Sequence, residues 1–245
     1  MTILAVCGLT REAEIAGGFY NGRGPLRKTA THFSGDRSGV VAVAGGGDAA
    51  GLKRKLDALH GDIRGVISIG LGGGLSPLLR VGDVVIAERI SFDGPLGQNS
   101  KVWDCDESWR VRLLSRLAHA HQGVIAASDM VLQDVGAKAG LHDRTGALAV
   151  DMESHIAARF AASRNVPLAA LRVISDDARH TLPPAALVAM QPDGSISIAR
   201  VLWSLVKKPQ QLPALVRTGR GSSKAFKELL RCRDLCGVGL AGTDL

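Results

Sequence analysis

Two short segments of this sequence place carboxylates directly after apolar runs. "AVDMES" (residues 149–154) carries Asp151 and Glu153 around a methionine, and "RVISDD" (residues 172–177) carries Asp176 and Asp177 after the next apolar run. Open α/β sheets bind ligands at the carboxyl ends of their strands, so Glu153 and Asp176 are expected to share one cleft. Their strands would lie about 5 Å apart as neighbours, or about 10 Å apart with one strand between them.

Two carboxylates in one cleft can divide the work of cleaving a glycosidic bond. An ionised carboxylate accepts hydrogen bonds from a vicinal diol such as that of ribose, whereas a carboxyl with a raised pKa donates a proton to the leaving group. Cleavage through an oxocarbenium-like sugar uses such a pair. In the structural alternative, Glu153 only starts a helix, where an acid suits the helix dipole, and Asp176 only caps the next turn. The spacing by itself leaves both interpretations open.

Alternating strand and helix patterns surround these acids. Apolar runs typical of strands cover residues 2–9, 39–44, 64–75, 81–90, 122–131, 145–152 and 167–176. Helices are expected over residues 10–19 with Thr10 as N-cap, from Asp48 as N-cap to Gly61, and over 153–165, where Asn165 and Pro167 stop the helix. These patterns predict one α/β domain over residues 1–205, with three layers and a mostly parallel, twisted central sheet flanked by helices.

The last part of the chain has a different character. Between residues 200 and 233 only Glu228 opposes a series of lysines and arginines, and helical patterns at 195–208 and 222–235 flank a proline-containing segment at 209–221. These helices could cover the sheet with a solvated basic face, or form an apolar and basic surface that touches a membrane or a greasy substrate. Residues 206–245 are predicted to be a basic helical C-terminal extension packed on or beside the main domain.

Composition limits the class of protein and its partners. The chain has 245 residues, of which 46% are hydrophobic and 22% charged, and this excludes disorder as the general state. The net charge of +7 favours phosphate or an anionic membrane surface, while aromatic residues, at 4%, are too sparse to suggest nucleic-acid binding. The four cysteines form neither a disulfide framework nor a metal motif, so we expect free thiols and no metal. With no signal peptide or membrane span apparent, we expect a cytoplasmic protein, with peripheral contact to the inner membrane left open.

Four segments together resemble the superfamily of purine nucleoside phosphorylases and methylthioadenosine/S-adenosylhomocysteine nucleosidases. The longest is "AVDMESHIAARFAASRNVPLAALRVISDDA" (residues 149–178), which is similar to the family's VDMES…RxISD signature. The others are "SIGLGGGLSPLLRVGDVVIAERI" (residues 68–90), "AGGGDAAGL" (residues 44–52) and "VCGLTREAEI" (residues 6–15). Their order and spacing match the family from about residue 3 to residue 205.

The resemblance implies a role for each residue of the matching motifs. Asp176 would protonate purine N7 as the base leaves, and Ser175 would help to hold the purine. Glu153 would bind the ribose diol, and Met152 would pack on the sugar. The segment "SDMVLQ" would lie beside the base through Val131 and Leu132, where Val131 replaces an aromatic residue of the family.

The same resemblance implies a site for a nucleophile, with phosphate as the co-substrate considered and no other cofactor. The residues assigned to this site are Arg11, Gly45, Gly70 and Gly72. Glu12 and Glu14 both lie near the position of the family's first-turn acid, and we favour Glu12 as the residue that organises the nucleophile. Leu71 stands where the family has a small hydroxyl residue, so the choice between phosphate and water stays open.

Within the superfamily, the chain most resembles the hopanoid-associated phosphorylases. The features are the "GLTREAEI" opening, "LPPAALVAMQPDG" (residues 182–194) and the basic tail. This implies adenosylhopane as the substrate, with adenine released, in a homodimer such as the family commonly forms. The alternative within the superfamily is a nucleosidase or phosphorylase that acts on a soluble nucleoside such as methylthioadenosine.

Two further classes of protein are less well supported. "GLGGGL" (residues 70–75) with Glu88 resembles a dinucleotide-binding fingerprint, but the following "SPLLRVGDVVI" returns to strand where that fingerprint requires a helix. A non-enzymatic module that binds lipid or nucleic acid rests on charge alone, and charge does not explain carboxylates at two strand ends.

Overall fold

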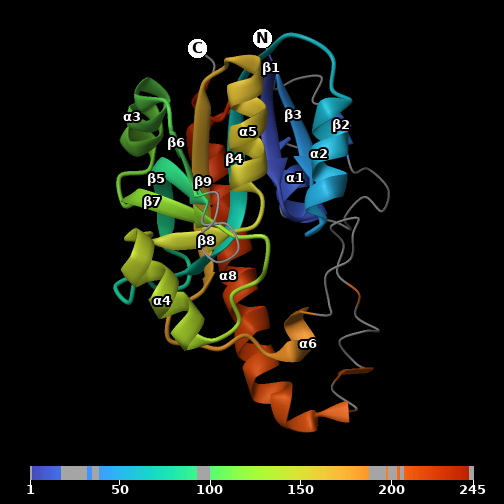
Figure 1. The fold of residues 1–245 in the computed structure, drawn as a ribbon, viewed down its shortest axis with the longest axis vertical. Helices are drawn as coiled ribbons and strands as arrows, with labels where there is room; N and C mark the ends of the chain where they lie inside the picture. Colours follow the sequence, from blue (N-terminus) through green and yellow to red (C-terminus); the bar gives the residue numbers. More distant parts are fainter. Residues whose placement is uncertain are drawn as a thin grey trace.

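The computed structural model describes residues 2–17, 32–34, 39–92, 100–187, 197, 203–204 and 207–242, and it confirms the predicted α/β fold class, with a central sheet between layers of helices (Figure 1). The strands are β1 (Thr2–Cys7), β2 (His32–Ser34), β3 (Val40–Ala44), β4 (Ile63–Gly74), β5 (Val84–Phe92), β6 (Lys101–Asp104), β7 (His121–Ala127), β8 (Ala149–Asp151) and β9 (Leu168–Asp176). The helices are α1 (Thr10–Ala16), α2 (Ala49–Asp57), α3 (Glu107–Arg116), α4 (Val135–Thr145), α5 (Ser154–Arg164), α6 (Pro184–Leu187) and α8 (Leu212–Cys236).

The sheet closes on itself through its central strands. Its order in the described residues is β2-β3-β1-β4-β8-β7-β5-β6, and β9 pairs with both β4 and β5. The strands β4, β9, β5, β7 and β8 therefore form a closed ring of pairings, in which β8 runs antiparallel to β4 and parallel to β7. The strand patterns of the sequence did not indicate this ring, because an alternating pattern specifies which face is buried but not which strand is the neighbour.

The long strand β4 separates the two strands that carry the predicted acids. Its residue Gly73 is in register with Val150 of β8 on one side and with Asp176 of β9 on the other. This corresponds to the wider of the two predicted arrangements, with one strand between the acids. The glycine-rich end of β4 thus forms the floor between them.

Helices cover both faces of the sheet, as strand alternation requires. In β1, Ile3, Ala5 and Cys7 pack into one buried cluster with residues of α1, α3 and α8, while Leu4 and Val6 pack into another with residues of α2 and α5. Figure 1 shows α5 in front of the sheet and the long helix α8 running behind it. The acids at the strand ends are therefore held by a core packed on two sides.

Predicted helix boundaries were partly wrong. Helix α1 begins at Thr10, so the cap residue is Leu9 and not Thr10. Asp48 is confirmed as the N-cap of α2, since its side chain accepts a hydrogen bond at 2.8 Å from the backbone N–H three residues later. Helix α2 ends at Asp57, before the predicted stop at Gly61. Helix α1 ends at Ala16 with Gly17 as its C-cap, so the predicted end at residue 19 was too late.

A helix that the sequence pattern did not indicate shortens a predicted strand. Residues predicted as strand over 145–152 form only the three-residue β8, because α4 occupies the chain up to Thr145 and Gly146 then ends the helix in the left-handed conformation with φ 64°. The glycines within α4 weaken its helical pattern, which explains why it was missed. Asn165 is confirmed as the stop of α5, in the left-handed conformation with φ 51°.

The second of the two predicted C-terminal helices, at 222–235, begins earlier than expected. Helix α8 is continuous over 25 residues, including most of the segment predicted to interrupt it. Pro213 lies in its first turn, where a helix does not need the missing N–H. The predicted helix at 195–208 lies mostly outside the described residues. Within the part of the chain that the structure describes, no helix is long and apolar enough to cross a membrane.

Two glycines of α8 allow a direct test of how closely this helix approaches the site. A Cβ atom added to Gly221 would lie 2.4 Å from the backbone oxygen of Ser175, whereas one added to Gly219 would meet no atom of the described residues within 4 Å. Gly221→Ala is expected to lower the free energy of unfolding by about 1–3 kcal/mol through overpacking. Gly219→Ala is expected to leave it unchanged or raise it by up to about 1 kcal/mol through helix propensity.

Urea denaturation of the two variants and the wild type measures the difference. Equal stabilities for both alanine variants would contradict the close contact between α8 and the end of β9.

Candidate active site

Most of the predicted site residues meet at one cavity. The cavity encloses about 660 Å³, part of it open to solvent. The predicted residues that line it are Glu12, Gly72, Val131, Leu132, Met152, Glu153, Ser175 and Asp176. Further apolar walls come from Leu9, Leu71, Met130, Val150 and Leu182. Four acidic residues therefore line one largely apolar space: Glu12, Asp151, Glu153 and Asp176.

Glu12 is held at the start of α1 by backbone donors. Its Oε2 accepts hydrogen bonds from the N–H groups of Gly8 at 2.8 Å and Leu9 at 2.9 Å, and its Oε1 accepts one from the N–H of Leu71 at 2.9 Å. Burial raises the pKa of Glu12 above its ordinary value, and these N–H donors oppose that rise. A Cβ atom on Gly70 would lie 2.6 Å from Oε2, so the carboxylate needs a glycine there.

The structure separates the other candidates near α1 from the cavity. Glu14 is buried but is not among the residues that line the cavity, whereas Glu12 is. The guanidinium of Arg11 lies 4.3 Å above the ring of Phe226 in α8. Arg11 is thus directed to the contact between α1 and α8 rather than placed in the cavity wall.

Glu153 occupies the N-cap position of α5, yet its side chain makes no capping hydrogen bond. Its carboxylate lies instead against the end of β1, because a Cβ atom on Gly8 would be 3.1 Å from each carboxylate oxygen. Gly45 also lies against Glu153, because a Cβ atom added to Gly45 would be 3.4 Å from Cγ of Glu153. Burial, then the charges of Asp151 and Glu12, raise the pKa of Glu153 to about 8. Helix initiation alone does not account for this placement.

A buried arginine behind these acids was missed in the sequence. Arg172, in the middle of β9, forms an ion pair with Asp151 in which both side chains are 1% exposed. Its Nη2 also donates a hydrogen bond to Ser68 Oγ at 2.6 Å. The signal was present, because a charged residue within the apolar strand "LAALRVIS" needs a buried partner.

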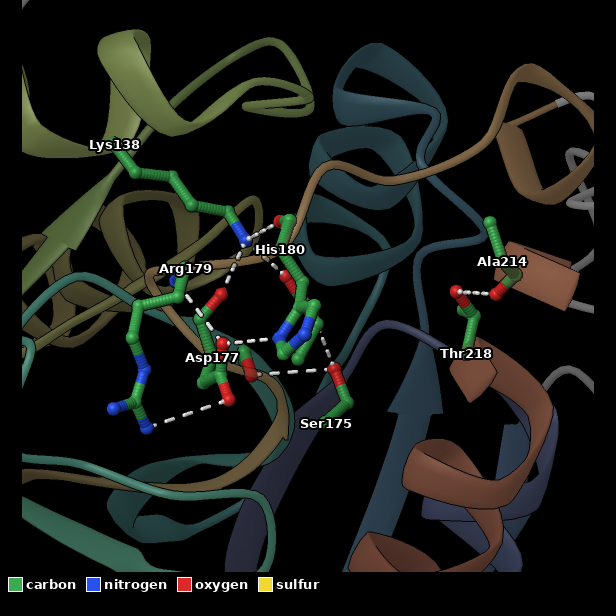
Figure 2. Close-up of polar contacts among 9 residues, drawn as sticks. Lys138, Ser175, Asp177, Arg179, His180, Ala214 and Thr218 are labelled. Atoms are coloured by element: carbon green, nitrogen blue, oxygen red, sulfur yellow. Dashed lines mark hydrogen bonds and ion pairs between the residues drawn. The ribbon is translucent and has the colours of Figure 1, made fainter. Parts of the chain in front are cut away.

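Asp176 lies at the end of β9 between two side-chain donors. Ser175 Oγ donates to its Oδ1 at 2.8 Å, and Lys138 Nζ donates to its Oδ2 at 2.6 Å. Lys138 comes from α4 and is fully buried. Its side chain extends to the end of β9 and to the loop after β9 that contains Asp177 and His180 (Figure 2). The sequence reasoning missed this lysine together with its helix. The only local signal was a single lysine among small residues in "VGAKAGL".

The neighbouring Asp177, not Asp176, organises the turn after the strand. Asp177 Oδ1 accepts a hydrogen bond from the backbone N–H of Arg179 at 3.0 Å and lies 2.6 Å from His180 Nδ1 (Figure 2). The alternative interpretation, in which Asp176 only caps the turn after its strand, is therefore wrong, because Asp177 caps that turn. The carboxylate of Asp176 stays directed at the cavity.

The raised pKa of Glu153 predicts a pH-dependent cost to stability. Between its ordinary value of 4.5 and about 8, the folded protein keeps a proton on Glu153 that the unfolded chain loses. This contribution to stability is fully present below pH 4.5 and is lost as the pH rises through 8. Glu153→Gln should remove it, and the unfolding free energy of the wild type should fall relative to this variant by up to about 1.4 kcal/mol per pH unit across the window.

Chemical denaturation of both proteins at pH 5, 6, 7 and 8 tests this expectation. Glu107→Gln is the matched control, because the Glu107 side chain is 84% exposed. A constant difference between the wild type and Glu153→Gln over this range would show that Glu153 titrates normally.

Comparison with known proteins places this fold in a defined group. Residues 37–207 match the phosphorylase superfamily. Among solved structures, a 5′-methylthioadenosine/S-adenosylhomocysteine nucleosidase from Streptococcus pneumoniae, with a transition-state inhibitor, is 19% identical with a TM-score of 0.61, over 95% of this chain and 99% of its own. The nucleosidase from Helicobacter pylori is 14% identical with a TM-score of 0.59, over 96% of this chain and 98% of its own. That from Neisseria meningitidis is 16% identical with a TM-score of 0.58, over 94% and 98%. These structures share the fold.

Proposed function

This chain belongs to the phosphorylase superfamily of nucleoside-cleaving enzymes, and from this premise we propose that it cleaves the N-glycosidic bond of a 5′-substituted adenosine and releases adenine. The observation that carries the proposal is the convergence of Glu12, Glu153 and Asp176 on one cavity. They come from α1, from the start of α5 and from the end of β9. An apolar cavity with three converging carboxylates suits a sugar that becomes cationic as its bond to the base breaks.

Each acid has a separate task in this proposal. The carboxyl group of Glu153, whose pKa burial raises to about 8, forms hydrogen bonds with the 2′ and 3′ hydroxyls of ribose, and Met152 packs against the sugar. When the bond from C1′ to N9 breaks, its electron pair moves to the purine, and Asp176 donates a proton to N7. Ser175 fixes the Asp176 carboxyl, while Val131 and Leu132 lie beside the base. Glu12, whose pKa burial raises, takes the proton from an attacking water.

Water is favoured over phosphate as the nucleophile. Among the described residues that line the cavity, none carries a cationic side chain, and an incoming phosphate dianion would meet four acidic residues there. Phosphorolysis is the second candidate reaction, with Arg11, Gly45, Gly70 and Gly72 as its predicted ligands. Adenine release that is independent of added phosphate, with free ribose derivative as the product, would support hydrolysis. Formation of a ribose 1-phosphate would support phosphorolysis instead.

We extend the proposal to an apolar 5′ substituent, with adenosylhopane of hopanoid biosynthesis as the substrate. Met130 lines the cavity and is 76% exposed, and Leu182 adds a second apolar side chain to the wall. An apolar group attached to C5′ could leave the cavity over these residues. Part of the apolar segment "LPPAALVAM" (residues 182–190), which would suit such a substituent, lies outside the described residues. A cytoplasmic homodimer with peripheral membrane contact through its basic C-terminal extension, residues 206–245, remains part of the proposal.

Chromatographic detection of adenine tests the function. The substrates are adenosylhopane in detergent and methylthioadenosine, each with and without phosphate. Release from adenosylhopane that disappears in Asp176→Asn would support both the reaction and the lipid substrate. Release from methylthioadenosine alone would keep the reaction and reject the hopanoid substrate, and no release from either would reject the proposed function.

A further inference from the structure

Lys138 is a buried cation held entirely by groups around the proposed general acid. Its side chain is 0% exposed, whereas the side chain of Asp176 is 12% exposed. The ammonium donates to Asp176 Oδ2 at 2.6 Å. It also donates to the backbone oxygen of Asp177 at 2.9 Å and to that of His180 at 3.0 Å, and Figure 2 labels these two residues beside Lys138. Three donors and three acceptors leave no proton of the ammonium for another partner. The charge of Lys138 therefore acts on Asp176.

This contact is in tension with general acid catalysis by Asp176 alone. A cation at hydrogen-bonding distance favours the ionised carboxylate, which has no proton to give to a leaving group. Ser175 adds to this effect, because its hydroxyl also donates to the carboxylate. The leaving purine, however, gains negative charge as the glycosidic bond breaks and needs a proton at N7. The pair must therefore supply a proton that Asp176 does not hold at the outset.

We propose that Lys138 is the positioning residue that supplies this proton through Asp176, an inference that rests on the proposed cleavage of a nucleoside. Nζ of Lys138 passes one proton to Oδ2 of Asp176, and the ion pair becomes a neutral amine and a carboxylic acid. Burial makes this exchange accessible, because desolvation disfavours both charges. The carboxylic acid then donates its proton to N7 while the electron pair of the C1′–N9 bond moves to the purine. The amine of Lys138 recovers a proton from solvent after adenine leaves.

Two substitutions separate proton supply from the simple holding of Asp176. Lys138→Arg keeps a cation with several N–H donors, but a guanidinium does not release its proton, and Lys138→Met removes both charge and proton. Lys138→Arg is expected to lower adenine release by about 10²–10⁴-fold, because the guanidinium keeps Asp176 ionised without supplying a proton. Lys138→Met is expected to lower it to a smaller extent, because the carboxyl of Asp176 can keep a proton of its own once the cation is removed. Both variants should cleave a 4-nitrophenyl riboside within about threefold of the wild-type rate, because nitrophenolate leaves without a proton and needs no general acid.

The outcomes distinguish this inference from the proposed function. A wild type that releases no adenine from any 5′-substituted adenosine overturns the proposed function. If the wild type releases adenine and the Lys138 variants release it equally well, proton supply by Lys138 is overturned. The proposed cleavage of a nucleoside then still stands. If the Lys138 variants lose the same factor in cleavage rate on the adenosine substrate and on the 4-nitrophenyl riboside, proton supply by Lys138 is also overturned. A structural defect would lower both rates, because it does not depend on the leaving group. Lys53→Met is the matched control, since Lys53 pairs with Asp57 at the same 2.6 Å but on the surface.

A second measurement covers the case in which arginine is too large for the site. Lys138→Ala removes most of the side chain and leaves space for a small cation. Added ethylammonium is expected to restore adenine release, and added guanidinium is not, because only the amine can transfer a proton. Restoration by both cations to the same extent, or by neither, would overturn proton transfer from Lys138.

Discussion

Asp176→Asn is expected to lower the rate of adenine release by about 10²–10⁴-fold, the usual contribution of a general acid. The asparagine side chain has the same size but only one acceptor oxygen, so its NH₂ group must face one of the two donors that bind separate oxygens of Asp176, Ser175 or Lys138. It also cannot pass a proton to N7. Initial rates of adenine release, measured by chromatography, give the effect on the reaction. The thermal midpoint of the variant, measured alongside, shows how far the loss of the anionic partner of buried Lys138 destabilises the fold.

The adjacent Asp177 offers a control in the same segment. Its carboxylate contacts Arg179 and His180 in the turn and does not contact Lys138 or Ser175 by any hydrogen bond in the described residues. Asp177→Asn should therefore release adenine at a rate within about tenfold of the wild type, since it retains the proton donor. If Asp176→Asn turned over as fast as Asp177→Asn, Asp176 would not be the general acid.

Glu12→Gln is expected to produce the second large loss, again of about 10²–10⁴-fold in adenine release. The carboxylate of Glu12 accepts three backbone N–H groups in the wild type, and it is the only acid of α1 that lines the cavity in the described structure. A glutamine amide cannot take a proton from water, and its NH₂ group must face at least one of those N–H groups. We therefore expect a stability loss of about 1–3 kcal/mol beside the loss of activity.

The pH profile separates the two effects of this substitution. In the wild type, the rate should rise with pH as the carboxyl of Glu12, whose pKa burial raises, becomes ionised. Glu12→Gln should lose this ascending limb, which a destabilised but otherwise intact enzyme would keep. Glu14→Gln is the control for the alternative first-turn acid. A larger loss in Glu14→Gln than in Glu12→Gln would reverse the assignment of these two residues.

Local patterns were sufficient to predict the fold class and much of the cavity. Apolar runs that end in glycines or acids specify strands whose carboxyl ends meet at one edge, and this edge is where Glu153 and Asp176 lie in the structure. Asp48 and Asn165 were correct as helix boundaries because capping depends on a few adjacent residues. The structure also shows that Asp177, and not Asp176, caps the turn after β9.

Other features depended on contacts between distant segments. The pairing of β9 with both β4 and β5 closes the sheet, and α8 passes through a segment whose prolines and glycines suggested a break. Propensity is a weak signal in such a helix, because packing against β9, β4 and α1 stabilises it. Local sequence cannot report that packing.

The sequence by itself determined which acids stand at the strand ends, and the tertiary structure decided what surrounds them. Arg172 and Lys138 are ordinary charged residues in the sequence. Their importance follows only from burial, because Arg172 is buried beside Asp151 and Lys138 beside Asp176. The physical reason is that the charge state of a carboxyl depends on its desolvation and on neighbouring charges within a few ångströms. In this protein those neighbours come from helices and strands far away along the chain.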